Sequence, residues 1–136
     1  WLRAMVSLEQ GRIDESNAWR ERNLALLKEG TGGEEGTSLE WGRYYQLEGR
    51  LSLVQGRVSE ALEHLARAKT IFESSRASVE TARTAYWCAQ VYLRADKLGK
   101  ARDELTQAQE TFVRLGASAD LRRTAQFLAG LNKVVA

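Results

Sequence analysis

The sequence predicts an all-α protein, and three observations support this prediction. Proline is absent, several glycines lie between segments of helical periodicity, and no stretch shows the β-branched alternation of a strand. Large and small apolar residues also alternate along a segment that recurs forty positions later: Val58, Ala61, Leu65, Ala68, Phe72, and then Leu98, Ala101, Leu105, Ala108, Phe112. Steps of three and four keep each set on one helical face, where the alanines let a neighbouring helix approach closely.

Composition places the chain among ordinary soluble domains. It has 136 residues, 43% hydrophobic and 28% charged, and we expect a single domain over 1–136. A net charge of +2 from mixed signs gives no reason to expect binding to DNA or to a membrane. One cysteine excludes an intrachain disulfide, and no apolar run approaches the ~18 residues of a membrane span. Without a signal-peptide pattern we expect a cytoplasmic protein, and the start at Trp1 indicates a fragment of a longer chain.

The repeat places the individual helices. Three segments, which we take as the first helices of successive units, align without gaps: 38–52, 78–92 and 118–132. The second helix of a unit follows a turn that is marked by Gly11, Gly56 or Asp96. In chain order, we expect about seven helices, over residues 1–10, 12–29, 38–54, 57–75, 78–94, 97–115 and 118–134.

Serines mark the expected starts of the first helices. Ser38, Ser78 and Ser118 occupy the N-cap position, and each is followed two residues later by an acid. A capping hydroxyl accepts a free backbone N–H and contributes about 1 kcal/mol to helix stability.

The units are therefore expected at about 1–29, 38–75 and 78–115, followed by a last helix over 118–134. The glycine-rich stretch 30–37 is five residues longer than its counterparts, and we expect a flexible loop there.

The first unit departs from the pattern. Ser16, Arg20 and Asn23 stand where the later units have alanine, leucine and alanine. We expect its second helix to pack less regularly or to face solvent on one side, because terminal repeats are atypical.

The unit resembles the tetratricopeptide repeat (TPR). The matching residues are the small Gly49 and Ala89, the turn residue Gly56, the alanines Ala61, Ala101, Ala68 and Ala108, and the aromatic Phe72 and Phe112. The period of 40 instead of 34 and the missing closing proline depart from that family and imply longer helices. The resemblance implies a right-handed α-solenoid of antiparallel helix hairpins.

Forty-residue units with the phrases Gly-Arg-Val-Ser-Glu-Ala-Leu and Thr-Phe-Val-Arg-Leu-Gly-Ala are also similar to one bacterial group. This is the superhelical sensor region of large ATP-dependent LuxR-type activators of the maltose-regulator (MalT) kind. The resemblance implies a non-catalytic segment of a bacterial transcriptional or signalling regulator, which binds a protein partner or an effector. Neither a phosphate-binding loop nor a DNA-reading helix-turn-helix is identifiable in the chain.

By resemblance to TPR arrays, the first helix of each unit lines a concave groove. The side chains expected there are Arg43, Gln46, Arg50, Arg83, Tyr86, Gln90, Arg123 and Gln126. Arginine suits carboxylates, so the functional interpretation is a groove for a protein or peptide partner or an anionic small effector. The alternative is that an acid three residues before each of Arg43, Arg83 and Arg123 forms only an i,i+3 salt bridge with it. The stack is then a structural spacer or a dimerisation surface with no specific ligand.

No residue pattern indicates catalysis, a metal site or a cofactor. His64 has no partner histidine or cysteine in its helix and is expected to be a partly exposed helix residue. Cys88 is expected to be a small buried apolar side chain. Trp41, Tyr44 and Tyr45 are expected in the core, with a groove contact as the alternative for one of them.

The last helix is expected to mediate self-association. Residues 118–134 contain the apolar Leu121, Ala125, Phe127, Leu128 and Leu131, and no later helix in the sequence covers them. Exposed apolar stripes mark interfaces, so a homo-oligomer through this helix is expected.

Overall fold

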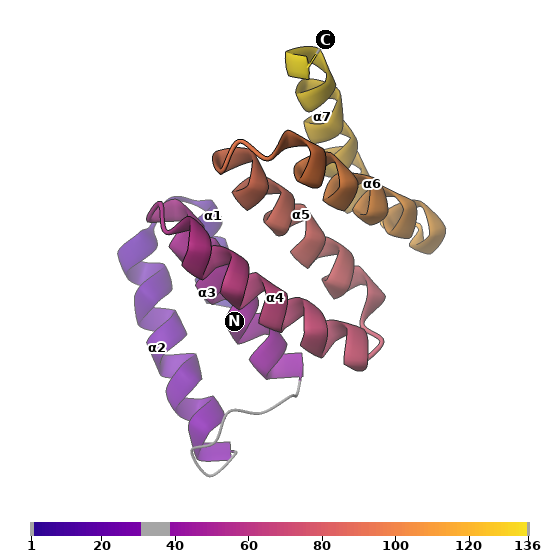
Figure 1. Cartoon of the computed structure of the whole chain (residues 1–136). Coiled ribbons are helices and arrows are strands. Elements are labelled where there is room, and N and C mark those ends of the chain that lie inside the picture. The colour runs from indigo at the N-terminus through magenta and orange to yellow at the C-terminus, as the bar shows by residue number, and fades with distance from the viewer. Residues whose placement is uncertain (1, 31–38, 136) are drawn as a thin grey trace. The chain divides into compact units, whose positions relative to one another are not determined.

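The protein is described by a computed structural model that covers residues 2–30 and 39–135. The described residues form seven helices and contain no strand, which confirms the all-α prediction (Figure 1). The helices are α1 (Leu2–Glu9), α2 (Ile13–Gly30), α3 (Leu39–Val54), α4 (Val58–Ser74), α5 (Ser78–Arg94), α6 (Leu98–Leu115) and α7 (Ser118–Val135). Each bound lies within one residue of its expected position. Apart from Gly30, which ends α2, the expected loop over 30–37 lies outside the described residues.

Every described turn between consecutive helices has the same backbone geometry. At Gly56, which has φ +76°, the amide donates to the Leu53 carbonyl at 3.0 Å and the Arg57 amide donates to the Ser52 carbonyl at 2.8 Å. These two bonds form a Schellman motif, in which a left-handed residue closes a helix. The left-handed residues of the five turns are Gly11, Gly56, Arg76, Asp96 and Gly116. Asp96 therefore takes the place of a turn glycine, as the repeat predicts.

The same turns correct the expected N-caps. The carbonyl of the residue after the left-handed one already accepts the first hydrogen bond of the next helix. The Thr81 amide donates to the Ala77 carbonyl, and the Leu121 amide donates to the Ala117 carbonyl, both at 2.9 Å. Ala77 is the N-cap of α5 and makes no side-chain cap bond. Ser78 and Ser118 thus lie one residue inside their helices, and the prediction that they cap them is wrong. Ser38 lies outside the described residues.

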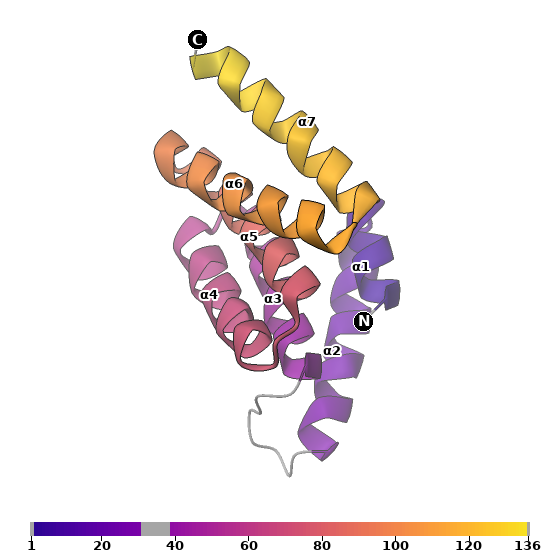
Figure 2. The ribbon, with the colours of Figure 1, turned by 90° about the vertical axis from the view of Figure 1, so that its right-hand side faces the viewer.

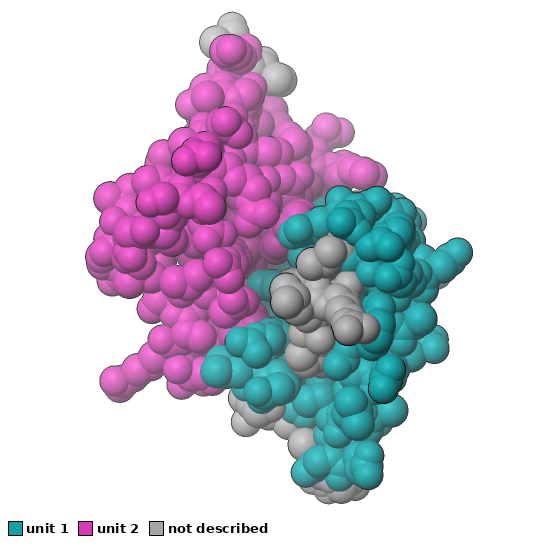
Figure 3. All heavy atoms as spheres, turned by 180° about the vertical axis from the view of Figure 1, so that it is seen from behind, with its two compact units in different colours: residues 1–71 teal, residues 72–136 magenta. Residues whose placement is uncertain are grey.

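The chain divides into two compact units, Trp1–Ile71 and Phe72–Ala136, and the boundary falls within α4 (Figure 3). In the first unit, α1 packs against α2 and α3 around a core of Ala4, Leu8, Leu47 and Leu51. The helices α3 and α4 cross closely at Gly49, where a Cβ would lie 2.5 Å from Leu65 Cγ and 3.2 Å from the Ala61 carbonyl oxygen. A glycine is therefore required at this crossing.

The helix α2 faces solvent, as expected for an atypical first unit. Ser16 is its one buried residue, and its hydroxyl donates to the Ala4 carbonyl at 2.9 Å. The later units have an alanine at this position, so the serine adds a hydrogen bond to the contact between the helices. Leu26 is 59% exposed.

In the second unit, α6 packs against both α5 and α7 (Figure 2). One core cluster joins Ala82, Ala85, Ala108 and Phe112. The other joins Tyr86, Ala89, Ala101, Leu105 and Leu131. The alanine, leucine and phenylalanine positions of the recurring stripe are buried both in α4 and in α6, which confirms that this stripe is the packed face.

Candidate functional site

The eight side chains expected in a groove differ widely in exposure. Gln46, Arg50 and Tyr86 are buried; Arg83, Gln90 and Arg123 are half-buried; Arg43 and Gln126 are exposed. The three buried side chains offer little surface to a ligand. The structure brings Arg83, Tyr86 and Arg123 together in the second unit, whereas Gln90 and Gln126 lie further along the same helices.

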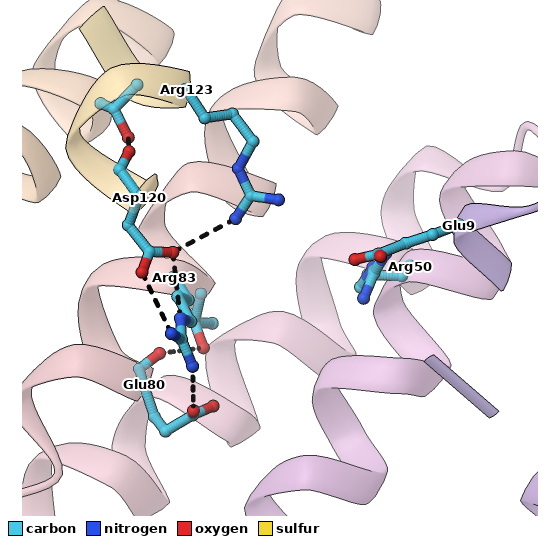
Figure 4. Close-up of polar contacts among 8 residues, drawn as sticks. Glu9, Arg50, Glu80, Arg83, Asp120 and Arg123 are labelled. Carbon is cyan, nitrogen blue, oxygen red and sulfur yellow. Dashed lines mark hydrogen bonds and ion pairs between the residues drawn. The ribbon is translucent and has the colours of Figure 1, made fainter. Parts of the chain in front are cut away.

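The central polar feature of the second unit consists of Glu80, Arg83, Asp120 and Arg123, which we call the Asp120 cluster (Figure 4). Arg83 on α5 donates from Nε to Asp120 Oδ1 and from Nη2 to Asp120 Oδ2, both at 3.0 Å. This two-bond pairing of a planar guanidinium with a carboxylate has the strongest geometry available to an ion pair. It ties the first turn of α7 to α5.

Glu80 completes the coordination of Arg83. It lies one helical turn before Arg83 and accepts from Nη1 at 2.9 Å, so all three guanidinium nitrogens are bonded. The hydrogen bonds to Asp120 raise the pKa of Arg83 above its usual value against the lowering effect of burial, and the charges of Asp120 and Glu80 act in the same direction. Arg83 is therefore charged at every pH at which the protein is handled.

Arg123 joins the cluster differently. Its Nη2 lies 3.4 Å from Asp120 Oδ1, and its guanidinium lies 4.7 Å from the centre of the Tyr86 ring and 5.8 Å from that of Trp87. Tyr86 and Trp87 are consecutive residues of α5 whose rings meet edge to face at 5.2 Å. The two rings hold the arginine by cation–π attraction, and only Nη2 bonds to a residue that the structure describes.

The i,i+3 salt bridges foreseen in the sequence form at two of the three arginines, Arg83 with Glu80 and Arg123 with Asp120. Arg43 is exposed, and it makes no ion pair within residues 2–30 and 39–135. In the first unit the buried Arg50 on α3 instead reaches Glu9 of α1 at 3.7 Å.

The pairing of Arg83 with Asp120 and that of Arg20 with Glu48 were missed by sequence reasoning. A signal for the first pair is present in the repeat. Asp120 lies thirty-seven residues after Arg83, one helical turn before the next member of the arginine column. An acid at this offset can reach the arginine of the preceding first helix as well as the arginine of its own helix.

The remaining candidates are placed as follows. His64 is half-buried and stacks on Tyr45 with ring centres 6.4 Å apart, and its Nδ1 is buried without a hydrogen-bond partner. Cys88 is buried, as expected for a small packing residue. Trp41 and Tyr45 are buried, whereas Tyr44 is half-buried with its ring edge against Trp41. Over residues 2–30 and 39–135, no three acidic, histidine or cysteine side chains form a group that could hold a metal ion.

Comparison of the chain with protein-family models, with curated proteins and with solved structures gives no match. None of the helices that the structure describes combines the length and apolar character needed to cross a bilayer.

Proposed function

We propose that the chain is a non-catalytic, TPR-like recognition segment that binds an acidic peptide or an anionic effector through the faces of its first helices. In this proposal the forty-residue units form a right-handed solenoid of antiparallel hairpins within a cytoplasmic bacterial regulator. The tight turns support the proposal, because left-handed residues fall at 56, 76, 96 and 116, twenty positions apart.

Arg123 carries the recognition proposal. The rings of Tyr86 and Trp87 position its guanidinium, and one nitrogen bonds to Asp120. A preorganised arginine loses little side-chain entropy when it binds a carboxylate. The remaining N–H groups are the donors that an incoming carboxylate would use.

The test is fluorescence anisotropy with a labelled octaglutamate peptide as the probe. We expect binding that weakens at least about tenfold in Arg123→Ala, a loss of ~1.4 kcal/mol. Arg114→Ala on α6 is the control, because Arg114 is exposed outside the Asp120 cluster and the substitution removes the same charge. Equal effects of the two substitutions would show that the peptide responds to net charge and would reject the site.

A specific observation favours a second candidate, a structural spacer without a groove ligand. All three nitrogens of Arg83 bond to carboxylates of the chain itself, and Arg50 pairs with Glu9. Such internal ion pairs would stabilise a helical stack that binds no ligand. This candidate predicts that the unaltered chain does not bind the peptide and that Arg83→Ala lowers the stability of the chain.

A further inference from the structure

The outward face of α7 is basic and carries small residues. Arg122, Gln126, Ala129 and Lys133 follow one another at steps of four, three and four, which place them on one stripe, and all four are exposed. Beside them a Cβ on Gly130 would meet no atom within 4 Å. Asp120, the one acid in the sequence of α7, is buried and bonded to Arg83. The exposed charges of this helix are therefore all positive.

The same columns are covered in α5. Ala82, Tyr86 and Ala89 align with Arg122, Gln126 and Ala129, and all three residues of α5 are buried in the clusters that α6 completes. The face that receives a helix on α5 is thus open on α7. A helix is the natural occupant, but alanine and tyrosine have been replaced by arginine and glutamine, so the occupant must supply acidic groups.

The helix α2 presents the complementary surface. Asp14, Ala18, Glu21 and Ala25 follow at steps of four, three and four and are all exposed, so acids and alanines alternate over most of one stripe, and the exposed Lys28 occupies its next position near the end of α2. The apolar Leu26, 59% exposed, follows Ala25 directly and so lies about 100° around the helix from it, outside the stripe. Four acids and two bases are exposed along α2, and one of the bases, Arg22, lies over the Trp19 ring at 5.5 Å.

We propose that the α7 stripe of one molecule docks on the α2 stripe of a second copy of this chain. Both helices have 18 residues, about 27 Å of length; the exposed charges of α7 are positive, whereas exposed acids outnumber exposed bases on α2. Alanines on both stripes permit a close approach of the two helices. The contact is heterologous, so it generates a closed ring or an open chain of copies.

Like-charged pairing excludes the symmetric arrangement. If α7 met α7 of the second copy, Arg122 and Lys133 would face the same residues without any exposed acid between them. A contact between two single helices buries less surface than a standard protein–protein interface, so we expect weak association that is detectable at protein concentrations up to about 1 mM. The association should weaken with added salt because salt screens the charges.

Sedimentation equilibrium of the whole chain with exchanged charges is the decisive experiment. The double variant Arg122→Glu/Lys133→Glu makes the α7 stripe acidic, and Asp14→Lys/Glu21→Lys makes the α2 stripe basic. Each variant alone juxtaposes like charges and is expected to stay monomeric. An equimolar mixture restores both attractive contacts, and its mean mass should return to that of the unaltered chain.

A small residue of the α2 stripe gives a test that does not depend on charge. Ala18→Leu is expected to raise the dissociation constant about tenfold, which is ~1.4 kcal/mol, because the larger side chain blocks the close approach of the two helices. Val113→Leu on α6, at a position that is 61% exposed, should leave the dissociation constant unchanged. Circular dichroism should show native helix content in every variant, because all the altered side chains are exposed. A monomeric mass of the unaltered chain up to about 1 mM would overturn the proposal, and so would a mixture of the charge variants that remains monomeric.

Discussion

At the residue scale, all five described turns require a left-handed backbone residue, but the sequence does not place a glycine at each of them. Three are glycines, and Arg76 and Asp96 adopt φ of 56° and 57° in the same geometry. A side chain at such a position crowds the following carbonyl, which costs about 1 kcal/mol relative to glycine. The two non-glycine turns are therefore held by the helices on either side of them.

The substitution Arg76→Gly should stabilise the protein by about 0.5–1 kcal/mol, because it removes this crowding while the Schellman bonds remain. The measurement is the urea midpoint at constant m-value. In the opposite direction, Gly56→Ala should destabilise by about 1 kcal/mol, although a Cβ on Gly56 would have open space around it. Arg76→Ala keeps the strain and serves as the control. A decrease in stability of Arg76→Gly would contradict the prediction.

A second glycine is constrained by its neighbours instead of by its φ angle. Gly49→Ala would place Cβ 2.5 Å from Leu65 Cγ, so we expect overpacking to outweigh the gain in helix propensity and to destabilise by about 1–3 kcal/mol. Gly99→Ala on α6 is the matched control, because no atom lies within 4 Å of its Cβ position, and it should stabilise by up to about 1 kcal/mol. Thermal melts that shift in the same direction for both variants would show that α3 and α4 do not cross closely at Gly49.

At the scale of elements, the Asp120 cluster determines how α7 is held to α5. Its strength lies in its geometry: two parallel bonds at 3.0 Å join a half-exposed arginine to a side chain that is 11% exposed. Exposed i,i+3 pairs elsewhere, such as Arg57 with Glu60 at 3.5 Å, lie within one helix and bring no second helix into place.

A double-mutant cycle tests this difference. With Arg83→Ala and Asp120→Ala, we expect a coupling energy of about 1 kcal/mol, compared with a few tenths for Arg57→Ala and Glu60→Ala. Chemical denaturation of the four variants of each cycle gives both values. Equal coupling in the two pairs would mean that Asp120 does not anchor α7.

The pH dependence of the Arg83 contribution follows from the direction of its pKa shift. A group with a raised folded-state pKa stabilises fully below its unfolded value and loses that contribution only as the pH passes the folded value. For an arginine this window lies above the working range. Arg83 is therefore expected to give the same coupling energy at pH 6 and at pH 9. A coupling energy that differs between pH 6 and pH 9 would show that a group titrating in this range also contributes to it.

At the scale of the whole molecule, the sequence predicted the helices better than their contacts. The alternation of large and small residues specifies helix faces directly, so Ala101, Leu105 and Phe112 are buried as expected. The serine caps were misplaced because a Schellman turn makes its next residue, such as Ala77, the N-cap of the following helix. Ser78 is therefore the first residue inside α5, and the sequence alone did not show that the helix starts one residue earlier than a serine cap would place it.

The candidate site was only partly predictable for a related reason. Arg83, Tyr86 and Arg123 were selected from a column of the repeat, and the structure brings them together. Their partner Asp120 lies on another helix, so its choice between Arg123 and Arg83 depends on the distance between α5 and α7, which periodicity does not contain. The burial of Gln46 and Arg50 likewise depends on which helices surround α3.

The described turns between consecutive helices contain only two or three residues, so they cannot absorb a change in length. One residue inserted beside Gly116 would rotate every later side chain by about 100° around the helix axis and advance it by ~1.5 Å. Leu131 would then turn away from the core, and the stripe that holds Arg122 and Lys133 would point in a new direction. Changes in length between these helices are therefore tolerable only when they add or remove whole helical turns, so the spacing of the turns is itself under structural constraint.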